Sequence, residues 1–207
     1  RRGALSMLTA AGFPESWGFK LPEAMLIIPE ILAAFPKARF VHLIRDPLTT
    51  CLRRTHMTAR LDNQIGQITL PLAYRYHGLP VTQILEDSPA VHMAYSTRQQ
   101  LLCALDTLAA LPADRYLEIR FEDMMRIPGK VNQRFARWLE KSPIQRLRMD
   151  ARCVLDKLTR RQAAPSVLEQ AIDPHRAAEP SVRYLPEVEA RVTTIVADLR
   201  ARLGYPH

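Results

Sequence analysis

The chain has 207 residues, of which 47% are hydrophobic and 24% are charged, and this length and balance are typical of one soluble globular domain. Disordered, collagen-like and coiled-coil proteins are excluded, and the most apolar stretch, residues 24–35, is shorter than the ~20 residues that span a bilayer. A net charge of +8 predicts attraction to an anionic partner without identifying it.

The hydrophobic pattern along the chain predicts alternating strands and helices. In chain order we expect a strand at 16–20, a helix at 29–35, a strand at 38–45, helices at 47–60 and 90–111, a strand at 116–121 and helices at 131–140 and 185–203. Residues 61–89 and 162–182 show no clear periodicity and are expected to be loops, which could form a lid or a substrate-binding wall. Strands that alternate with helices are typical of an α/β fold with a parallel sheet covered on both faces.

The three cysteines, Cys51, Cys103 and Cys153, lie far apart and form no CxxC pair. This pattern suggests neither a disulfide framework nor a zinc site, and it fits a protein of the reducing cytoplasm. The sequence contains no HxxxH or HExxH spacing that would suggest another metal site. The chain begins at Arg1 without an initiator methionine or a signal-peptide pattern, so we expect it to be a piece of a longer protein.

The strongest local signal is the segment His42-Leu-Ile-Arg-Asp-Pro47. A strand ends, Arg45 follows at its carboxyl edge, and Asp-Pro turns the chain into a helix. Ligands of open parallel sheets bind outside the carboxyl ends of the strands. An arginine there can grip a phosphate with two hydrogen bonds, and the N-terminus of the next helix adds a favourable dipole. An ion pair between Arg45 and a carboxylate at the sheet edge explains the spacing equally well.

The segment from Phe35 to Pro47 resembles the 3′-phosphate-binding segment of the sulfotransferases that use 3′-phosphoadenosine 5′-phosphosulfate (PAPS). Three further segments resemble that family in the same order: Trp17–Pro22 its Lys-x-Pro element, Tyr116–Asp123 its late strand of the Tyr-Glu-Asp type, and Ser181–Pro186, with the helix that closes on Leu203-Gly-Tyr205, its C-terminal end. The resemblance implies a single P-loop NTPase-like, three-layer α/β domain over residues 1–207, with helices flanking a central parallel sheet.

The resemblance also implies an activity and a set of site residues. It implies transfer of a sulfuryl group from PAPS to a hydroxyl, in preference to an amine, of a small-molecule, carbohydrate or peptide acceptor, without a metal. Arg45 would bind the 3′-phosphate with assistance from Arg53 and Arg183, and Lys20 would stabilise charge at the transferring group. Ordinary surface positions explain Lys20, Arg53 and Arg183 without any ligand.

The sequence departs from the family pattern at two places. The family usually has a serine eight residues after the strand-end arginine, where this chain has Arg53; an arginine is larger, but it binds phosphate more strongly than a hydroxyl does. The Gly/Ser/Thr-rich phosphosulfate loop of the family is not found before Trp17. We therefore expect the N-terminal strand, this loop and the general base to lie upstream of residue 1, unless the chain is a non-catalytic relative.

Other polar residues have simpler interpretations. His42, in the middle of a strand, is expected to be a core residue, whereas His56 and His77 could either serve as a base or face solvent. Glu122 and Asp123 are adjacent at the end of an expected strand, where neighbouring residues point to opposite faces, so they could not act as an acid/base pair. A structural ion pair is the better interpretation of these two carboxylates.

A basic nucleic-acid-binding module is the main alternative from another class. The basic run from Arg134 to Arg152 has no interleaved aromatic residue beyond Trp138, and no helix-turn-helix or zinc signature accompanies it. A solvated helix face accounts for the run better, and we expect no nucleic-acid partner. Neither the acceptor nor the oligomeric state follows from the sequence.

Overall fold

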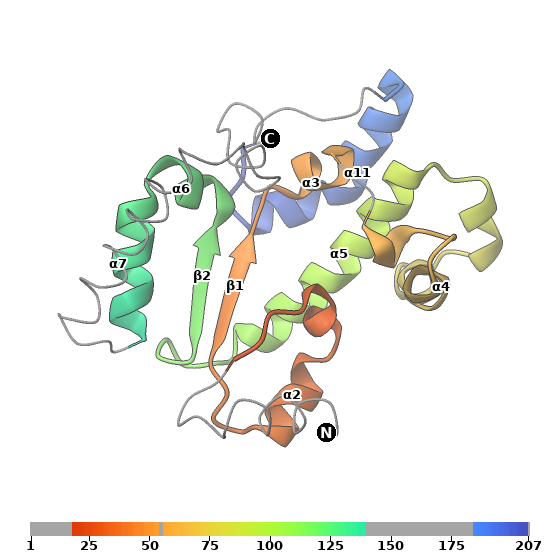
Figure 1. Ribbon diagram of the computed structural model, residues 1–207. Coiled ribbons are helices and arrows are strands. Elements are labelled where there is room, and N and C mark those ends of the chain that lie inside the picture. The colour runs from red at the N-terminus through yellow and green to blue at the C-terminus, as the bar shows by residue number, and fades with distance from the viewer. Residues whose placement is uncertain (1–17, 54–55, 140–183, 207) are drawn as a thin grey trace, which may run out of the picture.

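The structure is a computed structural model that describes residues 18–53, 56–139 and 184–206. Its described part is a small parallel sheet with helices packed against it and a helical region beside it (Figure 1). In chain order the elements are η1 (Pro22–Leu26), α2 (Ile28–Ala34), β1 (Phe40–Ile44), α3 (Pro47–Arg53), η2 (Met57–Ala59), α4 (Gln64–Tyr76), η3 (Val81–Leu85), α5 (Pro89–Leu108), β2 (Tyr116–Arg120), α6 (Phe121–Arg126), α7 (Pro128–Trp138) and α11 (Pro186–Arg202), where η marks a 3-10 helix.

Strands β1 and β2 are parallel neighbours, with Phe40 opposite Tyr116 and Ile44 opposite Arg120. The crossover between them contains α3, α4 and α5. A mixed helix and strand fold with a parallel sheet is therefore confirmed, although the sheet has only two strands within the described residues. Of the third expected strand, at 16–20, residues 18–20 are described and are not in a strand.

One face of the sheet packs on helices and forms part of the core. Ile44 of β1 lies in a cluster with Leu105 of α5 and Leu199 of α11, and Phe40 packs on a neighbouring cluster that contains Leu108. Helix α5 runs behind the sheet and continues into the helical region, where it also contacts α3, α4 and α11 (Figure 1). This long helix is therefore the common support of both regions.

The opposite face of the sheet is covered unequally. Helix α7 packs on β2, and Leu117 and Ile119 of this strand are buried. Their neighbours on β1, Val41 and Leu43, are 43% and 51% exposed. The expectation of a sheet covered on both faces is therefore wrong for β1 in the structure as described.

The expectation of a loop over residues 61–89 is also wrong, because this stretch contains α4 and η3. The side-chain oxygen of Asn63 accepts a hydrogen bond from the Ile65 N–H (2.9 Å) and starts α4. Gly66 is buried against backbone, since a Cβ there would lie 2.0 Å from the Arg60 carbonyl oxygen. Packing of α4 on α5 overrides the weak helix preference of Gly66 and of Pro71 within the helix.

The expected helix at 47–60 is too long. Helix α3 ends at Arg53, and His56 is extended before η2 begins at Met57. The other expected elements are confirmed to within a few residues as α2, β1, α5, β2, α7 and α11. The expected loop at 162–182 lies outside the described residues. Within the described ranges, every helix is too short or too polar to cross a membrane.

Candidate functional site

Asp46 organises the carboxyl end of β1. Its carboxylate accepts hydrogen bonds from the Leu48 backbone N–H (3.1 Å) and the Thr49 hydroxyl (3.2 Å), which is the capping arrangement that starts α3. The same carboxylate pairs with Arg200 of α11, whose Nε lies 2.9 Å from Oδ1. The Asp46 carboxylate thus occupies the N-terminus of α3, and a contribution of this helix end to ligand binding stays a prediction.

Glu122 joins this edge to the end of β2. Its Oε1 accepts a hydrogen bond from the Asp46 backbone N–H (3.0 Å), and its Oε2 accepts one from the Tyr205 hydroxyl (3.0 Å). Burial and the Glu122 carboxylate raise the pKa of Tyr205, so this hydroxyl stays protonated and keeps donating. Glu122 therefore serves as a structural acceptor.

The placement of Glu122 and Asp123 on a strand is wrong, since both residues lie in α6, after β2 has ended at Arg120. The expectation of a structural ion pair is confirmed for Asp123, whose Oδ1 lies 2.9 Å from Nη2 of Arg126. The two carboxylates thus have separate structural partners.

The turn after α11 brings Tyr205 to the sheet edge. Gly204 has a φ of 67°, a value that glycine adopts without strain. The Gly204 N–H donates to the Ala201 carbonyl (3.0 Å) and the Tyr205 N–H donates to the Arg200 carbonyl (2.9 Å), which is a Schellman motif. The predicted end of the last helix is confirmed, and the turn directs the Tyr205 side chain toward Glu122.

Arg45 lies half-buried beside this network. Its guanidinium carbon is 5.0 Å from the centre of the Phe121 ring, within cation–π distance. Burial lowers the pKa of Arg45, the charge of Arg53 lowers it further, and Glu122 and Asp46 act in the opposite direction. An arginine remains charged under such shifts. Arg53 is thus one of the charged groups that act on Arg45, and the binding of a phosphate by both residues stays a prediction.

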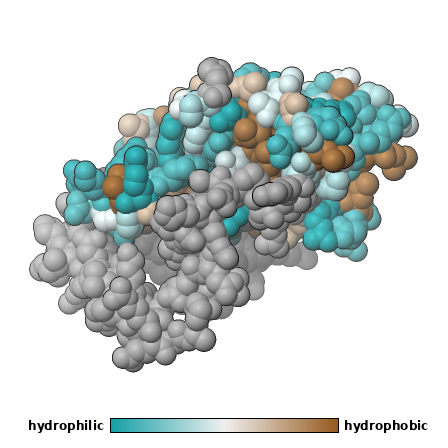
Figure 2. All heavy atoms as spheres, turned by 90° about the horizontal axis from the view of Figure 1, so that it is seen from above, coloured by the Kyte–Doolittle hydropathy of each residue, from teal (hydrophilic) through white to brown (hydrophobic). Residues whose placement is uncertain are grey.

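Charged groups of both signs meet at this edge. Three guanidinium groups, those of Arg45, Arg53 and Arg200, face two carboxylates, those of Asp46 and Glu122. Figure 2 shows the molecule from above, the side toward which β1 and β2 point, and hydrophilic residues predominate over much of its described surface. Arginines at a strand end of this kind can bind an oxyanion through their hydrogen bonds.

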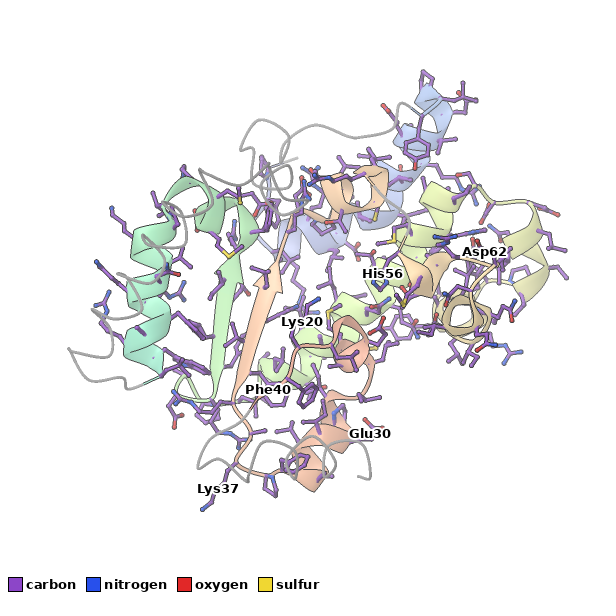
Figure 3. The ribbon with its side chains drawn as sticks, viewed as in Figure 1. Lys20, Glu30, Lys37, Phe40, His56 and Asp62 are labelled. Carbon is purple, nitrogen blue, oxygen red and sulfur yellow. The ribbon has the colours of Figure 1, made fainter. Side chains whose placement is uncertain are left out.

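The other predicted site residues are not joined to this cluster. Lys20 is exposed, and within the described part of the chain no hydrogen bond or ion pair connects it to Arg45 or Arg53. Figure 3 places Lys20 beside β1, below the strand's carboxyl end. Arg183 lies outside the described residues. The described residues contain no group of three or more His, Cys, Asp or Glu side chains that could hold a metal ion.

Two histidines have internal roles. His42 is buried, as predicted, with Nδ1 3.4 Å from the Tyr116 hydroxyl, and burial lowers its pKa to about 4. His77 uses both ring nitrogens: Nδ1 accepts from Nη1 of Arg98 (2.8 Å) and Nε2 donates to the Tyr95 carbonyl (3.1 Å). Neither nitrogen of His77 is available to act as a base in this arrangement.

Sequence reasoning missed the contribution of α11 to the site. Arg200 and Tyr205 complete the edge through Asp46 and Glu122, yet only the Gly204 turn was visible as a local signal. A basic residue in the last turn of a helix is common because it interacts well with the helix dipole. Nothing in the sequence distinguishes that role of Arg200 from its pairing with Asp46.

The fold and the cluster are those of an α/β protein with charged side chains gathered at the carboxyl edge of a parallel sheet, where such proteins bind their ligands. The chain matches the model of the Sulfotransferase family over residues 4–146, more than half of its length. The protein therefore belongs to the sulfotransferase family, and the resemblance noted from its motifs is confirmed. The matched region includes Lys20, Arg45 and Arg53. Searches of the curated proteins and of the solved structures found no match.

Proposed function

We propose that the protein transfers a sulfuryl group from PAPS to a hydroxyl group of an acceptor molecule. Membership of the sulfotransferase family supports sulfuryl transfer. The observation that carries the choice of donor is the arginine pair at the end of β1, where Arg53 lies close enough to Arg45 to lower its pKa. A sulfuryl donor that carries a second phosphate, away from the reacting group, could be bound through that phosphate by such a pair of arginines.

The residues at this edge fit a 3′-phosphate. A phosphate monoester carries a charge of about −1.5 to −2 near neutral pH, and two neighbouring guanidinium groups repel each other until an anion lies between them. Arg45 offers a planar fork that matches two phosphate oxygens. The Phe121 ring beside it restricts the orientation of that fork. PAPS, when bound, supplies the activated sulfuryl group.

The chain's own residues would bind and position the reactants. Arg45 and Arg53 would hold the 3′-phosphate with help from Arg183, while Asp46, through its cap on α3, fixes the backbone on which both arginines stand. Lys20 would stabilise negative charge on the oxygen that leaves the sulfuryl group. Group transfer between two oxygens depends mostly on positioning and on charge stabilisation of this kind.

A thermal-shift titration tests the donor site. We expect 3′,5′-adenosine bisphosphate to stabilise the protein by about 2.7 kcal/mol at roughly 100 times its dissociation constant, and AMP, which lacks the 3′-phosphate, to stabilise it far less. The shift should disappear in Arg45→Ala and persist in the matched control Arg75→Ala, an exposed arginine in the last turn of α4. Equal shifts with both nucleotides would contradict the proposal.

The same experiment separates the alternatives. A nucleic-acid-binding module would be stabilised by an oligonucleotide in a way that falls steeply with salt and does not depend on Arg45. A non-catalytic relative would bind the bisphosphate through Arg45 but would release none of it from PAPS in the presence of hydroxyl acceptors. The proposed enzyme requires both selective binding and acceptor-dependent release.

A further inference from the structure

A buried polar cluster connects η2 to α5. Thr58, Ser96 and Gln100 are 1%, 1% and 6% exposed, respectively. The Gln100 amide donates to the Ser96 hydroxyl (2.8 Å) and to the Thr58 hydroxyl (3.1 Å), and Ser96 Oγ lies 3.2 Å from Thr58 Oγ1. Burying three polar side chains is costly unless their hydrogen bonds are satisfied, and here they satisfy one another. The cluster leads to the imidazole of His56.

The cluster fixes the tautomer of His56. The ring nitrogen Nδ1 lies 3.4 Å from the Thr58 backbone N–H and 3.2 Å from Thr58 Oγ1. A backbone N–H can only donate, so Nδ1 accepts. The Thr58 oxygen already receives hydrogen bonds from Gln100 and Ser96, so its own hydrogen points to Nδ1 as well. In neutral His56 the proton is therefore on Nε2.

The Nε2–H group of His56 is left for a ligand. No described residue accepts a hydrogen bond from this N–H group. Nε2 is also not one of the buried side-chain atoms that lack a partner within the described residues, so it is accessible to solvent. This differs from His77, where both ring nitrogens are used internally. The only lone pair of neutral His56 points into the protein, which argues against a role as general base.

His56 is close in the sequence to the proposed donor site, since it follows Arg53, the last residue of α3, by three positions. Its cluster includes Ser96 and Gln100 of α5. Met25 of η1, the element after Lys20, packs on a cluster that contains Leu101, the next residue of α5. Figure 3 shows Lys20 and His56 between β1 and α4.

We propose that His56 is a tautomer-locked hydrogen-bond donor whose Nε2–H binds an oxyanion of the nucleotide ligand, and that Thr58, Ser96 and Gln100 are its positioning residues. This rests on the proposed function. The oxygen belongs either to a phosphate of the nucleotide or to the sulfuryl group, which share the same chemistry. A neutral N–H suits this task because it can hydrogen-bond a developing or resident negative charge without taking part in proton transfer.

Binding measurements with two nucleotides test the donor role. In His56→Leu we expect the dissociation constant of PAPS to rise about tenfold or more, the loss of one charge-assisted hydrogen bond, and His56→Gln, which keeps an N–H, to recover most of it. A matching loss for 3′,5′-adenosine bisphosphate identifies a phosphate, and a loss for PAPS alone identifies the sulfuryl group. His77→Gln is the matched control and should change neither constant.

Histidine nitrogen spectra test the positioning role. In ¹⁵N-labelled protein, long-range ¹H–¹⁵N correlations should show His56 as the Nε2–H tautomer, a mixture in Thr58→Val, and the Nε2–H tautomer again in Thr58→Ser. Affinity should follow the same order. An Nδ1–H tautomer in the wild type would overturn the inference. It would also be overturned if His56→Leu bound PAPS with unchanged affinity while binding still depended on Arg45. If the wild type binds neither nucleotide, the proposed function fails and the inference falls with it.

Discussion

Two of the arginine–aspartate pairs that tie α11 to other elements, Arg191–Asp87 and Arg200–Asp46, lie in different settings. In the helical region, Nη1 of Arg191 is 2.6 Å from Oδ1 of Asp87, whose side chain is 2% exposed. At the sheet edge, Nε of Arg200 is 2.9 Å from Oδ1 of Asp46, whose side chain is 18% exposed. The same residue types thus join the same helix to a buried carboxylate in the helical region and to a partly buried carboxylate at the sheet edge.

The difference lies in the surrounding charge. The Asp87 carboxylate also accepts hydrogen bonds from the Tyr74 hydroxyl (2.7 Å) and the Gln83 amide (3.3 Å), both uncharged, so one anion balances one cation. Around Asp46 the neighbouring groups are themselves charged, namely Arg45, Arg53 and Glu122. The comparison teaches that an ion pair among further charged groups at a sheet edge is a better candidate for a binding site than one surrounded by uncharged donors.

Removing the buried carboxylate should have the largest effect on stability. Arg191 is 44% exposed and can be solvated without its partner, but a buried donor left without an acceptor costs about 1–3 kcal/mol, and we expect Asp87→Ala to lower the free energy of unfolding by about 3 kcal/mol because the Tyr74 hydroxyl loses its acceptor. Urea denaturation measures this. The bisphosphate affinity of the folded protein should not change. A large loss of affinity would mean that the two regions are not distinct.

Acid should weaken the sheet region through His42. Burial lowers the pKa of His42 to about 4, whereas an unfolded histidine titrates near 6.5. Between these pH values the unfolded chain binds more protons, so stability falls as the pH drops from about 6.5 to 4, by up to about 3 kcal/mol. Unfolding measured across that range should show a shallower pH dependence in His42→Leu. An unchanged slope would assign the effect to other groups.

Asp46→Ala should have a smaller effect on stability but should also affect binding. The substitution removes the α3 cap and the Arg200 partner, and for a partly exposed pair with a cap we expect a loss of about 2 kcal/mol. It also shifts the backbone that carries Arg45. Calorimetry with 3′,5′-adenosine bisphosphate should therefore show weaker binding, in contrast to Asp87→Ala. Equal affinity in both variants would remove the distinction between the two pairs.

Tyr205→Phe should give the smallest of these effects. It deletes the hydroxyl that donates to Glu122 and keeps the ring that packs near Arg120. One such hydrogen bond contributes about 1 kcal/mol, measurable by urea denaturation. The exposed pair Arg126–Asp123 provides a control, since Arg126→Ala should cost no more than about 0.5 kcal/mol. A Tyr205→Phe effect no larger than this control would show that the bond is not stabilising.

Local signals in the sequence predicted most of the fold. The strand before Arg45 and the last helix, with Pro186 near its start and Gly204 after its end, are determined by short-range patterns and were found. Helix α4 was missed because Gly66 and Pro71 obscure its periodicity. Gly66 is needed for contact with the Arg60 backbone, a tertiary constraint that a single sequence does not display.

The candidate site was predictable only in part. Arg45 could be placed because a strand end followed by Asp-Pro puts it at a ligand-binding edge, and the structure brings Arg53 beside it. The partners of Asp46 and Glu122 could not be found, since Arg200 and Tyr205 lie 154 and 83 residues away from them along the chain. Such pairs depend on how α11 crosses the sheet edge, which no local pattern encodes.

The sheet edge is assembled from distant parts of the chain, and this has a consequence for protein synthesis. While the ribosome is still translating, Asp46 can cap α3, but its partner Arg200 and the Tyr205 hydroxyl have yet to be made. Domains generally begin to fold as they emerge from the exit tunnel. A nascent chain that stops short of α11 therefore lacks the contacts that secure its anion-binding edge.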